Sequence, residues 1–285
     1  MITQKLSTLL LTALVSFSSY DALAQKKFEL AHVAKLINVS DPQISPDSKS
    51  IAIVVSRPDY GQKRFSAGLV LVAIASGKQR VLTRDRPTVS QPRWSPSGEQ
   101  LAFLAWAGQG KEAVNQLFLL LMMGGEAKQL TKTPKGVQHY AWNPDSESIA
   151  YVTADEPANK ADIEEGHTVF EVGNNDMLYW HATHAFAHLA GKTATDEPKR
   201  LTSGDWTLPV TIPPGAPSSP LSWSADGKAI MFVKIASPYS GDGQIRSIQR
   251  LTLADGSIKP LTSRERVESY PVCSPDESSI SLLDI

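Results

Sequence analysis

The residues best suited to chemistry are three histidines that lie close together in a chain of 285 residues. His181, His184 and His188 form H-x2-H-x3-H, a spacing that superficially suggests a metal site. On a helix the three side chains would share a face, but the repeat described below puts residues 184–189 on a strand, where His181 faces away from the other two. No cysteine or carboxylate stands at a fixed spacing from them. We therefore expect neither a metal nor another cofactor.

Motifs for nucleophilic catalysis and for phosphate binding are absent from the sequence. There is no G-x-S-x-G turn to carry a serine nucleophile, no G-x-x-x-x-G-K, and no G-x-G-x-x-G after a strand. The single cysteine, Cys273, excludes an internal disulfide, and we expect it to be a small buried hydrophobic residue. This chain alone is therefore not expected to catalyse a reaction.

Composition excludes some classes of protein. The chain has 28 Lys and Arg against 29 Asp and Glu, a formal net charge of −1, so nucleic acid is not an expected partner. Hydrophobic residues make up 41% and charged residues 20%, which is typical of a packed globular protein rather than a disordered one.

The N-terminus has the pattern of a signal peptide. Lys5 supplies a positive charge, residues 9–15 form a short apolar run, and Ala22-Leu23-Ala24 is an A-x-A site that predicts cleavage before Gln25. We expect residues 1–24 to be removed and the mature chain to be periplasmic or secreted, without membrane attachment. A buried N-terminal helix and a retained anchor are the alternatives. Residues 25–38 form a linker, with one short amphipathic helix predicted over 28–37.

A short pattern recurs five times after residue 38. The copies are ISPDSKSIAIV from Ile44, WSPSGEQLAFL from Trp94, WNPDSESIAYV from Trp142, WSADGKAIMFV from Trp223 and CSPDESSISLL from Cys273. The spacings between these anchors are 50, 48, 81 and 50 residues. A Leu-Thr pair precedes the last four anchors, and three times its leucine lies 12 residues upstream of the anchor. Regular spacing of two paired motifs indicates tandem structural units.

Each unit has the chemistry of a small antiparallel sheet. Ser-Pro-Asp-Gly is a turn sequence, because Pro presets φ, Asp bonds back to the backbone and Gly adopts a left-handed conformation. The run that follows is suited to a strand buried on both faces, and two further short strands end in Leu-Thr. Four strands in 40 to 50 residues are typical of a propeller blade, with the anchor Trp packed between neighbouring blades. A β-sandwich with coincidental turns is the alternative.

The predicted fold is all-β, an incomplete β-propeller of four-stranded WD40-like (PD40, TolB-like) blades over residues 39–285. We place the blades at about 41–83, 91–131, 140–202 with an insertion, 220–262 and 270–285, the last one truncated. About four and a half blades leave an open edge, which predicts aggregation and indicates the front portion of a longer protein. Within the insertion, residues 170–176 mix apolar, glycine and polar residues, so this segment is a candidate binding loop.

These repeats resemble the propeller of the prolyl oligopeptidase family of serine peptidases (family S9). The resemblance is to its bacterial dipeptidyl-aminopeptidase and acylaminoacyl-peptidase branch, and it covers roughly residues 28–285. The stretches that carry it are VSDPQISPDSKSIAIVVSRPDY (39–60), VSQPRWSPSGEQLAFLA (89–105), FEVGNNDML (170–178), SSPLSWSADGKAIMFVK (218–234) and RERVESYPVCSPD (264–276). The SPDG turns are shared with the Tol-system propeller protein, whereas FEVGNND and the Pro-rich stretch 208–220 are more specific.

The resemblance implies a non-catalytic propeller that admits and orients peptide substrates for an α/β-hydrolase domain, which would carry the catalytic triad and is missing here. In dipeptidyl peptidases of the family, acidic propeller residues hold the free amine of the substrate. Glu171 is the candidate for that role here, with Asp176 second. The alternative function is that of a periplasmic TolB-like binding or scaffold propeller with no enzymatic role. A decayed gene product is a third possibility.

The turns depart from the family pattern at several positions. The turn glycine is present as Gly98 and Gly227, whereas Ser48, Ser146 and Glu277 stand at the same position in the other repeats. A non-glycine residue in a left-handed conformation costs about 1 kcal/mol. These substitutions predict a propeller of marginal stability.

Overall fold

The computed structural model describes residues 29–154, 165, 183–186, 198–202, 206–209, 214, 219–236, 245–263 and 267–284. In this part of the chain nearly all regular structure is β-strand, and every pairing between strands is antiparallel. The predicted segments 1–24 and 170–176, with Glu171 and Asp176, lie outside the described residues.

The strands form five sheets, numbered here in chain order. Sheet 1 contains β1 (Asn38–Ile44), β2 (Ser50–Asp59), β3 (Arg64–Ala73) and β4 (Gln79–Val81). Sheet 2 contains β5 (Ser90–Trp94), β6 (Gln100–Ala107), β7 (Val114–Leu121) and β8 (Lys128–Gln129). Sheet 3 contains β9 (Val137–Trp142), β10 (Ile149–Ala154) and β11 (Thr183–Phe186). Sheet 4 contains β12 (Ser222–Trp223), β13 (Ala229–Ile235), β14 (Arg246–Thr252) and β15 (Ile258–Pro260), and sheet 5 contains β16 (Glu268–Cys273) and β17 (Ile280–Asp284).

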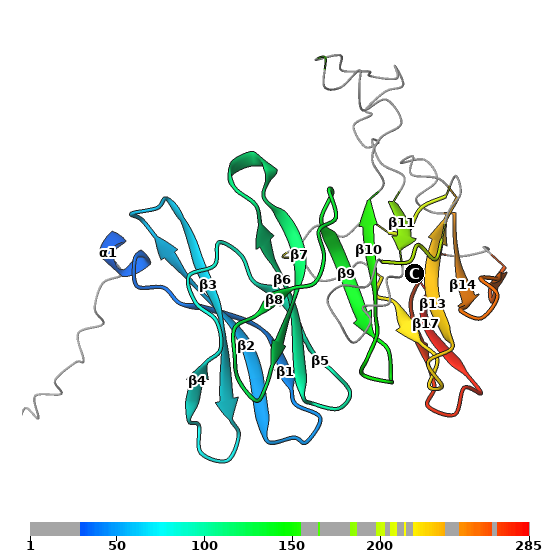
Figure 1. Cartoon of the computed structure of the whole chain (residues 1–285), viewed down its shortest axis with the longest axis horizontal. Helices are drawn as coiled ribbons and strands as arrows, with labels where there is room; N and C mark the ends of the chain where they lie inside the picture. Colours follow the sequence, from blue (N-terminus) through cyan, green and yellow to red (C-terminus); the bar gives the residue numbers. More distant parts are fainter. Residues whose placement is uncertain are drawn as a thin grey trace, which may run out of the picture.

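Strand order within each sheet follows the sequence, so each strand pairs with the next strand along the chain. The prediction of an all-β fold built from four-stranded antiparallel sheets is confirmed by sheets 1, 2 and 4. The blade boundaries and the number of blades stay predictions. Figure 1 shows the sheets following one another in a row, from sheet 1 (blue to cyan) at one end to sheets 4 and 5 (yellow to red) at the other.

The hydrophobic core consists of layers between neighbouring sheets. One layer joins sheets 1 and 2 and includes Ala52, Leu69 and Phe103, each 0% exposed. A second joins sheets 2 and 3 around Leu104 and Tyr151, and a third joins sheets 3 and 4. A four-stranded sheet has two apolar faces, so stacking buries both and provides the main driving force for the fold.

Among the described residues, helical structure is limited to α1 (Leu30–Val33) and the 3-10 turn η1 (Gly110–Glu112). The predicted amphipathic helix over 28–37 is wrong beyond Val33, and Leu36 and Ile37 are more than half exposed. A short helix needs a partner for its apolar face, and these two residues have found none among the described residues. Neither described helix has the length and apolarity needed to cross a membrane.

Candidate functional site

Three of the predicted structural anchors hold neighbouring sheets together by the same hydrogen bond. The indole Nε1 of Trp94 donates to the carbonyl oxygen of Gln43 at 3.0 Å, that of Trp142 to Arg93 at 3.0 Å, and that of Trp223 to Ala141 at 3.2 Å. In each case the acceptor is the residue just before the preceding anchor. The tryptophan therefore both packs against the preceding sheet and satisfies its own polar atom there, as an aromatic between two sheets must.

The other two anchors lack an indole and behave differently. Ile44 of sheet 1 is 63% exposed. Cys273 is partly buried, and its backbone N–H donates to Ser222 Oγ at 3.2 Å. Desolvation raises the pKa of the Cys273 thiol, so it is held in the unreactive protonated form.

The Ser-x-Asp turns of the repeats, with Pro at x except in Ser224-Ala225-Asp226, are ordered by their own side chains. Ser45, Ser224 and Ser274 each donate a hydroxyl hydrogen bond to the Asp two residues later, at 2.6 to 2.7 Å. Together with backbone N–H donors, these bonds lower the pKa of Asp226 and Asp276 to about 2. The carboxylates are therefore satisfied structural acceptors in Asx-type turns, and the same bonds keep them ionised at neutral pH.

The fourth turn residue is left-handed in every repeat, as the sequence predicts. Ser48, Ser146 and Glu277 have φ of 58°, 63° and 59°, beside 75° and 69° for Gly98 and Gly227. Two of the three non-glycine residues bond to the neighbouring turn: Ser146 Oγ accepts from Ser97 N at 2.9 Å, and Glu277 Oε1 accepts from Asp226 N at 2.8 Å. These substitutions therefore add contacts between sheets that partly offset the backbone strain.

Three of the four Leu-Thr pairs close their sheet onto its third strand. The hydroxyl oxygens of Thr83, Thr131 and Thr262 accept from the backbone N–H groups of Leu69, Leu117 and Ile248, at 3.1, 2.9 and 2.9 Å. The leucine just before each threonine donates its N–H to the carbonyl oxygen of the same third-strand residue at 2.8 Å. The same two hydrogen bonds to one third-strand residue therefore recur in sheets 1, 2 and 4.

Bulges in the inner strands of sheets 1, 2, 3 and 5 were missed by the sequence reasoning. In β1, β5 and β16 the register shifts two to three residues before the anchor, where Asp41, Gln91 and Tyr270 have positive φ, and in β9 it shifts at Gln138, four residues before the anchor. The bulges also connect neighbouring sheets, because Tyr140 Oη donates to the Gln91 carbonyl at 2.6 Å and Arg93 pairs with Asp41 at 2.9 Å. The recurrence of Ser40, Ser90, Ser219 and Ser269 four residues before the anchor was the available signal.

His139, which pairs with Val152 beside the bulge of sheet 3, is 0% exposed. Neither ring nitrogen has a hydrogen-bond partner among the described residues, and desolvation lowers the pKa of the imidazole to about 4. The ring is therefore neutral at pH 7. No group of three metal-ligating side chains occurs among the residues that the structure describes, and of the predicted histidine set only the backbone of His184, in β11, is among them.

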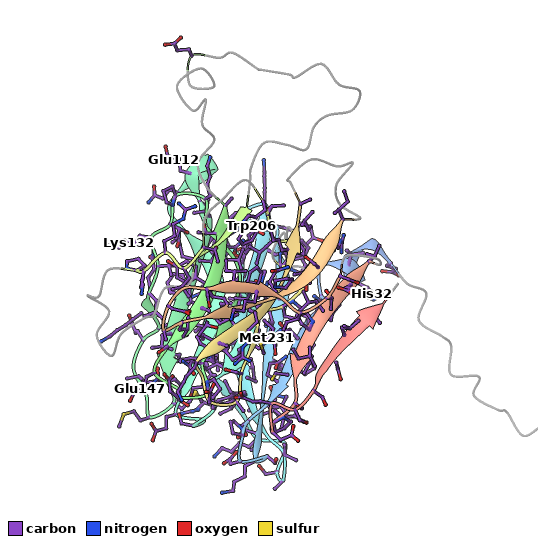
Figure 2. The ribbon with its side chains drawn as sticks, turned by 90° about the vertical axis from the view of Figure 1, so that its right-hand side faces the viewer. His32, Glu112, Lys132, Glu147, Trp206 and Met231 are labelled. Atoms are coloured by element: carbon purple, nitrogen blue, oxygen red, sulfur yellow. The ribbon has the colours of Figure 1, made fainter. Side chains whose placement is uncertain are left out.

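The connections between strands lie at two opposite edges of the sheets, and both edges carry charged side chains of either sign. Strand-to-strand turns that carry the SPD motif lie at one edge, with carboxylates such as Asp47, Asp145 and Asp226. At the opposite edge the connections 82–89 and 130–136 carry arginine and lysine. Figure 2 shows Lys132 and Glu112 toward one edge and Glu147 toward the other. Ala154 and Thr183, which flank the predicted binding segment and pair with each other, belong to the same edge as the connections 82–89 and 130–136.

The edge with the connections 82–89 and 130–136, called the loop edge below, also exposes aromatic side chains. Tyr60 and Phe65, at the β2–β3 hairpin, are 62% and 61% exposed, and Trp106 at the end of β6 is 44% exposed. Behind them, the guanidinium of Arg86 lies 4.4 Å from the Phe118 ring centroid, and desolvation lowers its pKa. Exposed aromatic and cationic groups are the residue types that dominate binding surfaces, so this edge is the candidate binding site. A shallow hollow between residues 199–201 and the β14–β15 turn lies elsewhere, on outer strands.

Comparisons with known proteins agree with the fold. No family model matches the chain. A curated relative, the "Uncharacterized peptidase YuxL" of Bacillus subtilis (strain 168), is 30% identical over 95 residues, which is 33% of this chain and 14% of that protein. A solved acylaminoacyl peptidase in complex with Z-Gly-Gly-Phe-chloromethyl ketone superposes with a TM-score of 0.59 and 17% identity, over 88% of this chain and 36% of the other.

The putative TolB from Agrobacterium tumefaciens superposes with a TM-score of 0.52 and 17% identity, over 87% of this chain and 70% of that chain. The chain thus spans about a third of the acylaminoacyl peptidase and a seventh of the curated relative. Its fold is similar to the N-terminal propeller of acylaminoacyl peptidase, which confirms the resemblance read from the repeats.

Proposed function

We propose that this chain is the non-catalytic propeller portion of an exported serine peptidase of the prolyl oligopeptidase type. In that role it admits and orients peptides for an α/β-hydrolase domain, which supplies the catalytic serine. The observation that carries the proposal is the similarity to the acylaminoacyl peptidase propeller over 88% of the chain, together with the sequence match to a peptidase. The exposed aromatic and basic side chains of the loop edge support peptide binding there.

The proposed contact with substrate is a carboxylate that holds the free amine of the peptide. Glu171 is the candidate residue and Asp176 the second, in the segment between β10 and β11. A carboxylate paired with an ammonium group forms a charge-assisted hydrogen bond, which is stronger than a neutral one. Arginine and lysine at the same edge provide donors for carbonyl and carboxylate groups of the peptide.

Peptide binding tests the proposal directly. We expect the full chain to bind Ala-Ala-p-nitroanilide at least about tenfold more tightly than its N-acetylated form in calorimetric titrations, a difference of about 1.4 kcal/mol. Glu171→Gln should remove this difference, whereas Glu165→Gln, an exposed residue of the same insertion, should keep it. Equal affinity for the two peptides in the wild-type chain would contradict the proposal.

The same substrate tests the absence of catalysis in this chain. We expect no release of p-nitroaniline, because the sequence contains no G-x-S-x-G turn. Turnover that a serine-directed inhibitor abolishes would contradict this.

Export is part of the proposal and rests on residues 1–24. A fusion of residues 1–30 to a reporter that is active only outside the cytoplasm should be active, and replacement of Leu9, Leu10 and Leu11 by Gln should abolish the activity. A reporter that stays inactive would contradict export.

A scaffold or binding propeller of the TolB type is the second candidate. One observation favours it: the chain spans 70% of the putative TolB, against 36% of the acylaminoacyl peptidase. Failure of the peptide titration combined with confirmed export would favour this second function.

A further inference from the structure

Arg86 places a positive charge against the apolar layer between sheets 1 and 2. Its guanidinium carbon lies 4.4 Å from the centroid of the Phe118 ring and 5.4 Å from that of the Phe103 ring. The two phenylalanines pair across β6 and β7, and their rings stack with centroids 5.6 Å apart and planes inclined by 18°. Arg86 is therefore seated on a platform of two aromatic rings, which attracts a cation and restricts its side chain.

The backbone of Arg86 is fixed on the third strand of sheet 1. Its N–H donates to the carbonyl oxygen of Ala67 at 3.0 Å, and its own carbonyl oxygen accepts from the N–H of Ala67 at 2.7 Å. Asp85, just before it, has a φ of 55°, which turns the connection onto β3. With both its backbone and its guanidinium held, Arg86 would lose little conformational freedom on binding a ligand.

The guanidinium makes no ion pair and no hydrogen bond within the described ranges. The carboxylate of Asp85, beside it in the chain, accepts a hydrogen bond from Ser66 Oγ at 3.2 Å. Glu126, exposed on the β7–β8 turn, is an acid whose charge reaches Arg86, but it lies beyond ion-pair distance. Arg86 is half-buried, and its nitrogens are not among the fully buried atoms that lack a partner, so they are open to solvent. A partly desolvated cation thus has its N–H donors available.

Packing alone does not require a charge at this place. In the layer between sheets 3 and 4, Phe232 lies nine residues after its anchor tryptophan, as Phe103 does in sheet 2. Phe232 is covered by the ring of Trp206, at 5.6 Å between centroids. Trp206 follows a Leu-Thr pair by four residues and Arg86 follows one by three. An aromatic ring therefore covers the phenylalanine in one layer without the cost of desolvating a charge, and the arginine in the other layer calls for a further partner.

We propose that Arg86 binds a carboxylate of a peptide, either its C-terminal group or an acidic side chain. A guanidinium stays charged at neutral pH, and its planar fork donates two parallel hydrogen bonds to a carboxylate. A single positive charge with Glu126 nearby favours a singly charged carboxylate over a phosphate dianion. The choice of a peptide as the source rests on the proposed function, whereas the match between guanidinium and carboxylate does not.

Calorimetric titration of the full chain with acetylated peptides tests the proposal. Acetyl-Ala-Ala-Ala with a free carboxylate should bind at least about tenfold more tightly than the same peptide with a C-terminal amide. Arg86→Gln should abolish this preference, and Arg86→Lys, which keeps the charge but loses the fork, should reduce it. Arg84→Gln, at an exposed arginine of the same connection, is the matched control and should keep the full preference. Urea unfolding of each variant checks that the fold is retained.

A second pair of peptides identifies the source of the carboxylate. Acetyl-Ala-Asp-Ala-amide and acetyl-Ala-Asn-Ala-amide differ only in a side-chain carboxylate. A preference for the aspartate peptide that Arg86→Gln abolishes assigns the site to an acidic side chain, and a preference for the free terminus alone assigns it to the C-terminus. All four probes are acetylated, so the result does not depend on the proposed amine contact of Glu171, and Glu171→Gln should leave it unchanged.

Three results would overturn the proposal. The first is equal affinity for the charged and the uncharged peptide in both pairs, as expected if Arg86 serves only as a distant partner of Glu126. The second is a carboxylate preference that persists in Arg86→Gln, and the third is one that Glu171→Gln removes. Failure of the titration with free and acetylated amines would instead count against the amine contact and leave the carboxylate site in place.

Discussion

Sheets 1 and 2 carry the same repeat and pair their strands in the same order, but they differ in how their second strands are buried. In β6 the run from Leu101 to Ala105 is 0% exposed throughout. In β2 only alternate residues are buried: Ala52 is 0% and Val54 is 4% exposed, while Ile51 and Ile53 are half-buried. Sheet 2 has a neighbour on each side, and sheet 1 has a described neighbour on one side only. Burial on both faces is therefore a property of position in the row and not of the strand sequence.

The turns of the two sheets show the same dependence on neighbours. Ser48 and Gly98 occupy the same left-handed position. The Gly98 position faces the Pro46 ring of the preceding turn, where an added Cβ would meet it at 3.5 Å. No hydrogen bond of the Ser48 hydroxyl is seen within the described ranges, whereas Ser146 in sheet 3 bonds to the turn before it. A residue at this position contributes contacts only where another turn stands beside it.

The largest expected effect is the loss of folding stability on truncation of Phe103, compared with its equivalent in sheet 1, Ile53. Phe103→Ala removes a ring that is 0% exposed and stacked on Phe118, and should lower the free energy of unfolding by about 3 to 5 kcal/mol. Ile53→Ala should lower it by less than half as much, because the side chain is half-buried. Urea denaturation measures both. Equal losses would show that the outward face of sheet 1 is covered in the folded monomer.

The second effect concerns the position three residues before the anchor, where sheet 1 has the partly accessible, ion-paired Asp41 and sheet 3 has buried His139. The pKa of His139 is about 4 in the folded chain, below its usual 6.5, so the fold excludes the protonated form. The resulting stability is complete above pH 6.5 and is lost as pH falls toward 4, by about 3 kcal/mol in all. Stability of His139→Leu should depend less on pH over this range. Parallel profiles for the variant and the wild type would show that His139 does not titrate as described.

A third effect tests the anchor. Trp94→Phe keeps one aromatic ring but removes the five-membered ring of the indole with the N–H that donates to Gln43, and should lower the free energy of unfolding by at least about 1 kcal/mol. Ile44→Trp adds the indole to sheet 1, where no acceptor is present among the described residues, and should give no gain. Thermal and urea unfolding of the two variants measure both changes in stability. A stabilised Ile44→Trp variant would mean that another sheet lies against sheet 1.

The smallest effect separates the two serines of the turns. Ser48→Gly relieves the left-handed strain without losing a contact between sheets and should raise stability by about 1 kcal/mol. Ser146→Gly relieves the same strain but loses the bond from Ser97 N, so it should leave stability nearly unchanged. The two variants, compared in one urea series, isolate the contribution of the neighbouring turn. A gain in stability of the same size in both variants would show that the neighbouring turn contributes nothing.

Much of the local structure could be predicted from the sequence because it depends on contacts within a unit. Pro and Asp in the turns, the left-handed fourth residue and the four strands all follow from local backbone preferences and from alternating burial. The bulges escaped prediction, since a bulge changes register by one residue without altering composition. The Leu-Thr pairs were recognised in the sequence by their fixed spacing, but the two hydrogen bonds that they make were not predicted. The predicted amine-binding residues Glu171 and Asp176 stay a prediction.

The sequence by itself determined the repeating unit: where each sheet turns, which residues alternate, and where a tryptophan recurs. Tertiary structure alone decided which faces are buried, where each indole finds its acceptor, and that His139 is held neutral. The physical reason is that hydrogen-bond and turn preferences act over a few residues, whereas desolvation depends on which sheet lies opposite. Ile44 and Trp94 occupy the same place in the repeat. Ile44 is exposed whereas Trp94 connects two sheets, because only Trp94 has a described sheet in front of it.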